Sequence, residues 1–475
     1  MPDIRYVCLS DMHLGASNSL LTNLKTANVD SDPLKPSPVL SQLVACLQAL
    51  IAQNASAQKP TLILNGDIFE LALTTDNEAI MAFERFVELI FPVGGEPLFN
   101  SIFYIPGNHD HHLWETARET QYAAHLSTLP PGSPLDPPWH VTNMIRYLPV
   151  PTTLMTQIIK RYPHLRDADV KVNTVYPNFA LLSDDEQKCV VFSHGHFVES
   201  MYLLMSTLRT MLFPDRKPPM QIWDFEAENF AWIDFFWSTM GRSGEVGRDV
   251  ELVYDKLQDE RQTQQLLSNL ATSLTKQWGP TWAEAVEGKA LAWVFNAVVG
   301  QFTGLERHDP SRVLSADAEK GLWAYVQGPL RQQLLIECGG EIPPDVAFVF
   351  GHTHKPFEED MNFEGYEQWV DVYNTGGWVV DTVDPEPLHG GAVILVDENL
   401  DTASLRMYNE AADPAQCPVR VEQATRAGVG DNPFHTRISG LVKPDAPPWT
   451  TFSELVARAV RVRQQDLRQK INSAT

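Results

Sequence analysis

Cysteine is scarce in this sequence of 475 residues. The count is odd, and the cysteines are scattered over the chain: Cys8, Cys46, Cys189, Cys338 and Cys417. A disulfide framework needs paired cysteines in a short secreted chain, and a closed zinc or iron–sulfur site needs closely spaced ones. We therefore expect reduced thiols in the core and a cytoplasmic location.

Long apolar runs are also missing. No stretch of about 18 uncharged apolar residues occurs, so we expect no helix that spans a membrane. Residues 1–5 lack the charged region and the small-residue cleavage site of a secretory signal peptide.

Basic residues are outnumbered by acidic ones, 36 against 60, which gives a formal net charge of −24. Since sequence-independent affinity for nucleic acids comes from lysine and arginine, this balance speaks against a nucleic-acid partner. We interpret the excess charge as an acidic, solvated surface.

One basic segment stands apart near the C-terminus. A helix is expected from Phe452, opened by a capping box over residues 451–454. It either presents a solvated face or meets an anionic lipid surface or a partner. Its basic residues are Arg458, Arg461, Arg463, Arg468 and Lys470.

The first 110 residues alternate between strand and helix patterns. Short β-rich runs at 4–9, 61–64 and 101–105 are separated by helical spacing of apolar residues at 39–53 and 78–91. This rhythm predicts an α/β layered architecture. A strand pair is expected from 172–182 and 188–193, and later strands at 346–350, 369–373, 392–396 and 403–408.

The composition and the periodicity of the sequence change in the middle of the chain. Residues 200–340 have helical patterns and hold seven of the twelve tryptophans. We therefore expect one α/β domain in two parts, 1–199 and 341–410. A helical insertion or cap at 200–340 interrupts it, and a tail at 411–475 ends in a helix.

Side chains that bind metals gather at the ends of the expected strands. Eight of the fourteen histidines lie in or beside these strand exits, counting His111 and His112. In open α/β sheets, ligands bind outside the carboxyl ends of the strands, where loops bring side chains together. Each of five expected strands is followed by one group of such residues. In chain order the groups are Asp11 and His13; Asp67; Asn108, His109 and Asp110; His194 and His196; and His352 and His354.

This mixture of donors indicates the type of metal. Carboxylate and amide oxygens together with imidazoles suit Mn²⁺, Fe²⁺, Zn²⁺, Co²⁺ or Ni²⁺. The set is larger than one tetrahedral ion needs, whereas two ions about 3.5–4 Å apart that share a carboxylate use that many donors. We expect two divalent cations, with manganese favoured.

Five motifs, in this order, resemble those of the calcineurin-like metallophosphoesterases. They are Ser10-Asp11-Met12-His13, Gly66-Asp67-Ile68-Phe69-Glu70, Gly107-Asn108-His109-Asp110, His194-Gly195-His196 and Gly351-His352-Thr353-His354. The resemblance covers about 1–200 and 341–410 of the chain. It implies a four-layer α-β-β-α metallophosphoesterase sandwich with a large helical insertion, and a metal-dependent hydrolase.

The resemblance also implies which residues hold the metal ions. Asp11, His13 and His354 would bind the first ion. Asn108, His194 and His352 would complete the second site. Asp67 would bridge both ions.

Other motif residues would serve catalysis. The resemblance implies that His109 is the general acid or the group that polarises the phosphate, with Asp110 orienting it. Glu70 stands where the family often has a carboxylate that does not bind the metal itself but fixes the orientation of a residue that does. The glycines at 66, 107, 195 and 351 are expected to permit tight turns that bring ligands close.

Three further histidines leave alternatives open. His196 stands where relatives often carry aspartate, and it either touches the substrate or orders its loop. His111 and His112 either contact phosphate or cap the helix that follows.

Two apolar segments bear on the substrate. Residues 197–213 are interpreted as a core helix or, alternatively, as an apolar wall beside the active site for an acyl chain. The aromatic-rich 223–237 is interpreted as part of the core or, alternatively, as an exposed surface that faces lipid or a membrane interface. Together with Tyr373-Asn374-Thr375-Gly376-Gly377-Trp378, the motifs look like the branch that contains UDP-2,3-diacylglucosamine pyrophosphatases. The longer insertion, the extra tail and His196 depart from that branch.

We accordingly expect hydrolysis of a phosphodiester, phosphomonoester or pyrophosphate bond. A lipid-linked substrate, with peripheral contact to a membrane, is the preferred case. The opening Ser10–Gly15 also resembles nucleases that process DNA ends, but the net charge opposes a basic channel. A non-catalytic scaffold is the third hypothesis, and the presence of every expected ligand speaks against it.

Overall fold

The computed structural model describes residues 2–25, 29–148, 150–217, 219–239, 312–411, 413–416, 418–424 and 432–473. The middle of the expected insertion, 240–311, and Cys417 lie outside the described residues.

An eight-stranded sheet forms one half of the core, in the order β15-β14-β13-β1-β4-β5-β7-β6. Strands β1, β4, β5 and β7 run parallel, so their carboxyl ends meet at one edge. Strands β13, β14 and β15 continue the sheet in antiparallel pairs. The strands are β1 (Ile4–Leu9), β4 (Thr61–Asn65), β5 (Ser101–Ile105), β6 (Val150–Pro151), β7 (Val172–Thr174), β13 (Gly390–Asp397), β14 (Thr402–Asn409) and β15 (Arg420–Glu422).

A five-stranded sheet forms the other half, in the order β11-β12-β10-β9-β8. Its central strands β9, β10 and β12 are parallel to one another. The strands are β8 (Asn178–Leu182), β9 (Lys188–Ser193), β10 (Asp345–Phe350), β11 (Phe357–Met361) and β12 (Val370–Asn374), and a separate hairpin joins β2 (Thr22–Leu24) and β3 (Ser31–Pro36).

The predicted strand at 172–182 is in fact two strands in different sheets. Its first part, β7, pairs with β5, while β8 forms the expected antiparallel pair with β9. Pro177 lies between the two parts. Proline has no N–H to donate to a strand ladder, which explains why the pairing breaks there.

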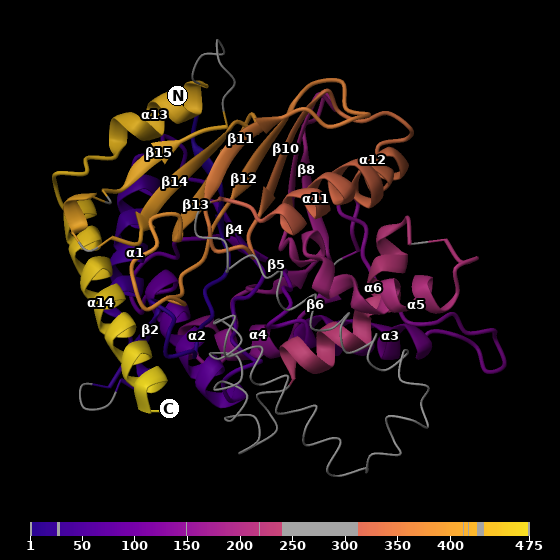
Figure 1. The fold of residues 1–475 in the computed structure, drawn as a ribbon, viewed down its shortest axis with the longest axis horizontal. Coiled ribbons are helices and arrows are strands. Elements are labelled where there is room, and N and C mark those ends of the chain that lie inside the picture. Colours follow the sequence, from indigo (N-terminus) through magenta and orange to yellow (C-terminus); the bar gives the residue numbers. More distant parts are fainter. Residues whose placement is uncertain are drawn as a thin grey trace.

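The two sheets pack face to face between two layers of helices (Figure 1). Apolar side chains from both sheets, among them Ile63, Phe192 and Val349, form the core between them. Helices α1 (Pro38–Ile51), α2 (Asp76–Ile90), α4 (Thr153–Lys160), α13 (Pro433–Leu441) and α14 (Trp449–Ser473) share a second core with the outer face of the larger sheet. Helices α11 (Ala316–Tyr325) and α12 (Arg331–Glu337) cover the smaller sheet. The predicted four-layer α-β-β-α order is confirmed.

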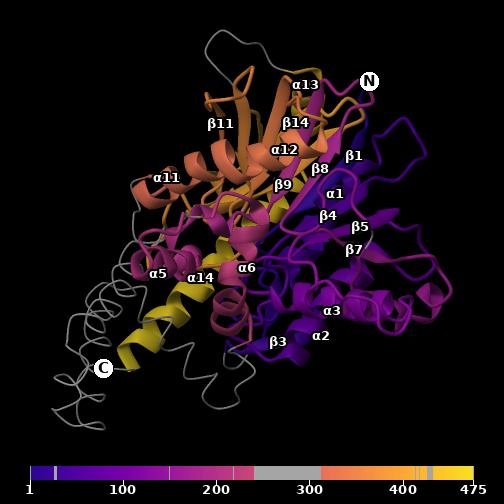
Figure 2. The same ribbon diagram turned by 90° about the vertical axis from the view of Figure 1, so that its right-hand side faces the viewer.

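The described parts of the insertion lie at its two ends. A short helical turn at His196–Val198 precedes it. Its first part contains a helical turn at Ser200–Leu203, then α5 (Leu204–Leu212), α6 (Ile222–Trp232) and a π-helical turn at Ile233–Ser238, and its last part contains α11 and α12. Helices α5 and α6 lie side by side below α11 (Figures 1 and 2), and the helical turns that precede α5 contact α11. Helix α3 (His112–Leu126) and the turns Pro163–Leu165, Val326–Leu330 and Pro414–Gln416 complete the described elements.

The apolar segments of the insertion divide between core and surface. Phe197, Met201 and Trp237 are buried, as expected for core helices. Phe213 and Phe235 are 59% and 66% exposed, so the core interpretation does not hold for the whole of either segment.

The C-terminal tail packs on the domain. Helix α14 lies along α1 (Figure 1) and buries Trp449, Phe452 and Val460. The predicted capping box is wrong, because the helix already begins at Trp449 and Thr451 lies inside it. Pro448 precedes the helix, and its fixed φ favours a helical start.

The cysteine prediction is confirmed for the described residues. Cys8, Cys46 and Cys189 are buried free thiols, and Cys338 is a partly buried one.

Gly321 tests the packing of α11 against the loop that leaves β9. A Cβ added to this glycine would lie 1.8 Å from the carbonyl oxygen of Val198. We expect Gly321→Ala to lower the free energy of unfolding by about 1–3 kcal/mol, because the helix must move outward. Gly440→Ala in α13 is the control, since nothing lies within 4 Å of its added Cβ. Denaturant titration of both variants measures the effect, and equal unfolding midpoints would contradict the close contact.

Candidate metal centre

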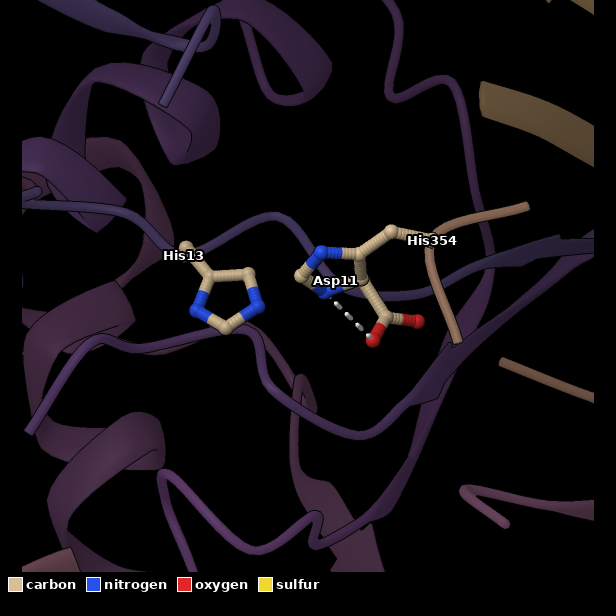
Figure 3. A group of neighbouring side chains, drawn as sticks. All are labelled: Asp11, His13 and His354. Atoms are coloured by element: carbon tan, nitrogen blue, oxygen red, sulfur yellow. Dashed lines mark ion pairs between the residues drawn. The ribbon is translucent and has the colours of Figure 1, made fainter. Parts of the chain in front are cut away.

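The five predicted motifs meet at one place. They follow the carboxyl ends of β1, β4, β5, β9 and β10, and their acidic, amide and imidazole side chains are buried. Three overlapping sets of donor atoms each lie within 4.8 Å of one another. The sets are Asp11, His13 and His354; His13, Asp67 and His109; and Asp67, His194 and His352. Figure 3 shows the first set, with the Asp11 carboxylate paired to the His354 ring.

Backbone conformation is unusual at most of the predicted ligands. Five of the predicted ligands have φ between 43° and 71°, in the left-handed region that side chains other than glycine rarely adopt. They are Asp11, His13, Asp67, His352 and His354. Such conformations cost free energy and persist where surrounding structure holds them, which is common at functional sites.

Glycines let the backbone approach the donors. A Cβ added to Gly107 would lie 2.2 Å from Asp67 Oδ1, and one added to Gly351 would lie 2.1 Å from Asp11 Oδ2. Gly66 and Gly195 have positive φ as well as close neighbours. The expected role of these glycines in tight, close-packed turns is confirmed.

Asp67 lies at the centre of the cluster. Its Oδ2 is 3.2 Å from His194 Nε2 and 3.8 Å from His13 Nε2, and its Oδ1 accepts a hydrogen bond from the backbone N–H of His109. Burial alone would raise the pKa of Asp67, but the surrounding histidines hold it well below its usual range. An ionised carboxylate shared by two donor sets is what a bridging ligand requires.

Glu70 supports two histidines from behind. Its two oxygens lie 2.7 Å from His13 Nδ1 and 2.8 Å from His109 Nδ1. Burial raises the pKa of Glu70, but His109 and His13 outweigh this effect and bring it to about 2. A carboxylate on Nδ1 fixes the ring and leaves Nε2 to face the cluster.

The predicted role of Asp110 needs correction. The carboxylate bound to the His109 ring is Glu70, whereas Asp110 accepts hydrogen bonds from the backbone N–H groups of Ile68, Phe69 and Gly107. Asp110 therefore organises the loops that carry Asp67 and Asn108. A local motif cannot reveal this difference, because Asp110 follows His109 directly while Glu70 comes from another strand end.

The second half of the cluster involves the insertion. His194 Nε2 lies 2.9 Å from Asn108 Oδ1, and the Nδ2 of the same amide donates to the hydroxyl of Tyr202. Because the amide nitrogen of Asn108 is hydrogen-bonded to Tyr202, its amide oxygen faces the cluster. Glu199 Oε1 lies 3.2 Å from His352 Nε2.

Sequence reasoning missed three residues that contact predicted ligands. Tyr202 and Glu199 follow the third histidine motif within an apolar segment that carries no metal-site pattern. Asp381 Oδ2 lies 3.1 Å from His354 Nδ1, much as Glu70 lies behind His13. Asp381 stands seven residues after Asn374, the last residue of β12, and lies outside every motif, so no local pattern marked it.

The three uncertain histidines have hydrogen-bond partners other than the predicted ligands. His196 Nε2 lies 3.3 Å from the hydroxyl of Tyr176. His111 occupies the cap position of α3, but its side chain makes no capping bond and instead lies 2.7 Å from Glu226 of α6. His112 Nδ1 lies 3.3 Å from Asp234, so both residues connect the domain to the insertion.

The residues present fit a transition-metal centre. His13 Nε2 is buried, faces the cluster and has no hydrogen-bond partner among the described residues. Carboxylate oxygens and neutral imidazole nitrogens suit the divalent metals expected from the sequence.

A comparison with protein families bears on the first part of the chain. Residues 4–223 match the family of calcineurin-like phosphoesterases. This segment is a calcineurin-like phosphoesterase domain. It contains Asp11, Asp67 and His194, whereas His352 and His354 lie beyond it and are added by the fold. No curated protein matches the chain.

Glu70→Gln tests the orienting role in this phosphoesterase domain. An amide offers one acceptor oxygen where two histidines now contact carboxylate oxygens, so one ring loses its support. We expect metal affinity to fall about 10- to 100-fold, measured by calorimetric titration with Mn²⁺. Glu84→Gln is the matched control, because Glu84 is a buried glutamate paired with Arg161. Equal Mn²⁺ affinities for the two variants would contradict the role of Glu70.

Proposed function

We propose that this protein is a dinuclear metal-dependent phosphoesterase that hydrolyses a phosphodiester, phosphomonoester or pyrophosphate bond. The observation that carries the proposal is the set of three donor groups that overlap at His13 and Asp67. Overlap of this kind fits two adjacent cations that share a carboxylate, whereas one tetrahedral ion would leave donors unused.

The predicted ligands divide between two half-sites. Asp11, His13 and His354 would hold one ion; Asn108, His194 and His352 would hold the other, and Asp67 would bridge them. When bound, two divalent ions lower the pKa of a water and stabilise the charge that develops on the phosphoryl oxygens. Manganese is the proposed metal, with iron, zinc, cobalt and nickel as alternatives.

His109 is the proposed proton donor. Glu70 contacts its Nδ1, which leaves Nε2 to meet the substrate. As a water oxygen bonds to phosphorus, the bond from phosphorus to the leaving oxygen breaks. The proton on His109 Nε2 passes to that leaving oxygen.

A lipid-linked substrate is the finer proposal. Large apolar side chains of the insertion are exposed: Met205, Leu212, Phe213, Met220 and Phe235. The same insertion reaches the metal cluster through Tyr202, whose hydroxyl accepts from Asn108. Acyl-chain contact next to the cluster would fit both features and the motif likeness to UDP-2,3-diacylglucosamine pyrophosphatases. Within the described ranges, no helix has both the length and the apolar character needed to cross a bilayer.

A substrate panel distinguishes this proposal from a nuclease. The Mn²⁺-loaded protein would be incubated with lipid-linked pyrophosphates, nucleotides, and single- and double-stranded DNA at modest salt. Preference for the lipid-linked compounds supports the proposal, whereas cleavage of DNA alone favours the nuclease.

Asp67→Ala is the test of the bridging carboxylate. Without it both half-sites lose a shared ligand, so we expect most Mn²⁺-dependent hydrolysis of bis-p-nitrophenyl phosphate to disappear while circular dichroism stays unchanged. Turnover retained by a metal-free preparation of this variant would count against the proposal. A wild-type protein that purifies without transition metal and takes none up would favour the non-catalytic scaffold.

His109→Gln separates proton transfer from metal binding. We expect kcat to fall about 10²- to 10⁴-fold, with two metal ions still bound. The loss should be larger for an alkyl ester than for a p-nitrophenyl ester, because a poor leaving group depends more on protonation. His125→Gln, an exposed histidine of α3, is the control. Loss of a metal ion on elemental analysis would show His109 to be a ligand instead.

A further inference from the structure

An arginine of the C-terminal helix lies buried against the loop behind the first half-site. Helix α14 buries Trp449, Phe452, Val456 and Val460 along one face, and Arg463 continues this face at 6% exposure. An apolar residue would be expected at this position. A buried cation is costly, so its contacts require an explanation.

Arg463 makes its contacts with backbone carbonyl groups. Its Nη2 donates to the carbonyl oxygens of Ser19 and Thr22, the latter at 2.8 Å, and its Nη1 donates to Ala459. No carboxylate forms an ion pair with Arg463 among the described residues. Burial lowers the pKa of Arg463 to about 10, which still leaves the guanidinium charged at neutral pH.

The loop of residues 15–22 that Arg463 holds is bonded to the backbone of the first half-site. Ser19 Oγ donates to the carbonyl oxygen of Met12, which lies between Asp11 and His13. Leu20 N donates to the carbonyl oxygen of Trp378, and Trp378 N donates to that of Asp11.

The same loop also reaches the third predicted ligand. Asn18 Nδ2 donates to Asp381 Oδ1 at 3.1 Å, and the other oxygen of Asp381 lies 3.1 Å from His354 Nδ1. Contacts therefore run without a break from α14 to the side chains of one half-site.

We infer that Arg463 is a positioning residue for the half-site of Asp11, His13 and His354, and that the C-terminal helix thereby completes the metal centre. The inference rests on the proposed two-metal function. The half-site of His194 and His352 should depend less on Arg463. It is joined to the first half-site by the hydrogen bond from His352 N to Asp11 Oδ1, but its other supports are Asn65, Tyr202 and Glu199, which lie outside the loop of residues 15–22.

Calorimetric Mn²⁺ titration of the full-length protein, with elemental analysis of the ions retained, tests the inference. We expect Arg463→Met to weaken one of two Mn²⁺ sites about 10- to 100-fold. Arg463→Lys should fall between this variant and the wild type, because a lysine cannot span both carbonyl groups equally well. Arg458→Met, on the exposed side of α14, is the control and should bind as the wild type does.

Two backgrounds identify which site responds. With the second half-site removed by His194→Gln, adding Arg463→Met should abolish most of the remaining Mn²⁺ binding. With the first half-site removed by His354→Gln, adding Arg463→Met should change nothing further, since coupled changes are not additive.

The inference fails if folded Arg463→Met binds two Mn²⁺ ions with wild-type affinity. It fails equally if both sites weaken alike, which would mean that the arginine serves general stability. If Arg463→Met does not fold, Asn18→Ala is the deciding variant, because it removes the hydrogen bond from the loop of residues 15–22 to Asp381. Wild-type Mn²⁺ affinity of this variant would then overturn the inference. A wild-type protein that binds no Mn²⁺ would refute the two-metal centre itself, and this inference with it.

Discussion

The structure is arranged around one buried carboxylate, that of Asp67. Placing an ionised group at 1% exposure is costly unless positive charge and hydrogen bonds surround it. Here His194 and His13 supply ring nitrogens, and the backbone N–H of His109 supplies a hydrogen bond. Gly107 is required because any Cβ would overlap with Asp67 Oδ1, and Asp110 holds the adjoining loops. Strained φ values at several ligands follow from this need to direct many donors at one point.

Two parts of the chain outside the strands of the parallel core contact the two proposed half-sites, which the hydrogen bond from His352 N to Asp11 Oδ1 also joins to each other. The segment that contains Glu199 and Tyr202 reaches the second half-site. The C-terminal helix reaches the first through Arg463 and the loop that includes Asn18. Segments outside the parallel core are thus in contact with side chains and loops that hold the proposed metal ligands.

Local patterns predicted the elements whose signals were strong. The strands at β1 and β5 and the helix α1 agree with the expected ranges, because apolar periodicity and a following glycine, proline or polar turn defined them. The strand at 172–182 was divided because the sheet to which each half belongs depends on long-range pairing. The start of α14 was misplaced because a capping-box pattern competes with a proline that can begin a helix equally well.

The sequence by itself determined which donor groups stand at successive strand ends, since carboxylate, amide and imidazole side chains there indicate a metal centre and the five ordered motifs resemble those of phosphoesterases. Tertiary structure alone decided which side chains hold those donors in place. Glu70 rather than Asp110 contacts the His109 ring, and Asp381 contacts Nδ1 of His354. Arg463, hundreds of residues away in the chain, donates hydrogen bonds to the loop that follows Asp11 and His13. The reason is physical: a ligand's identity is a local property, whereas its orientation depends on contacts between residues that only the folded chain brings together.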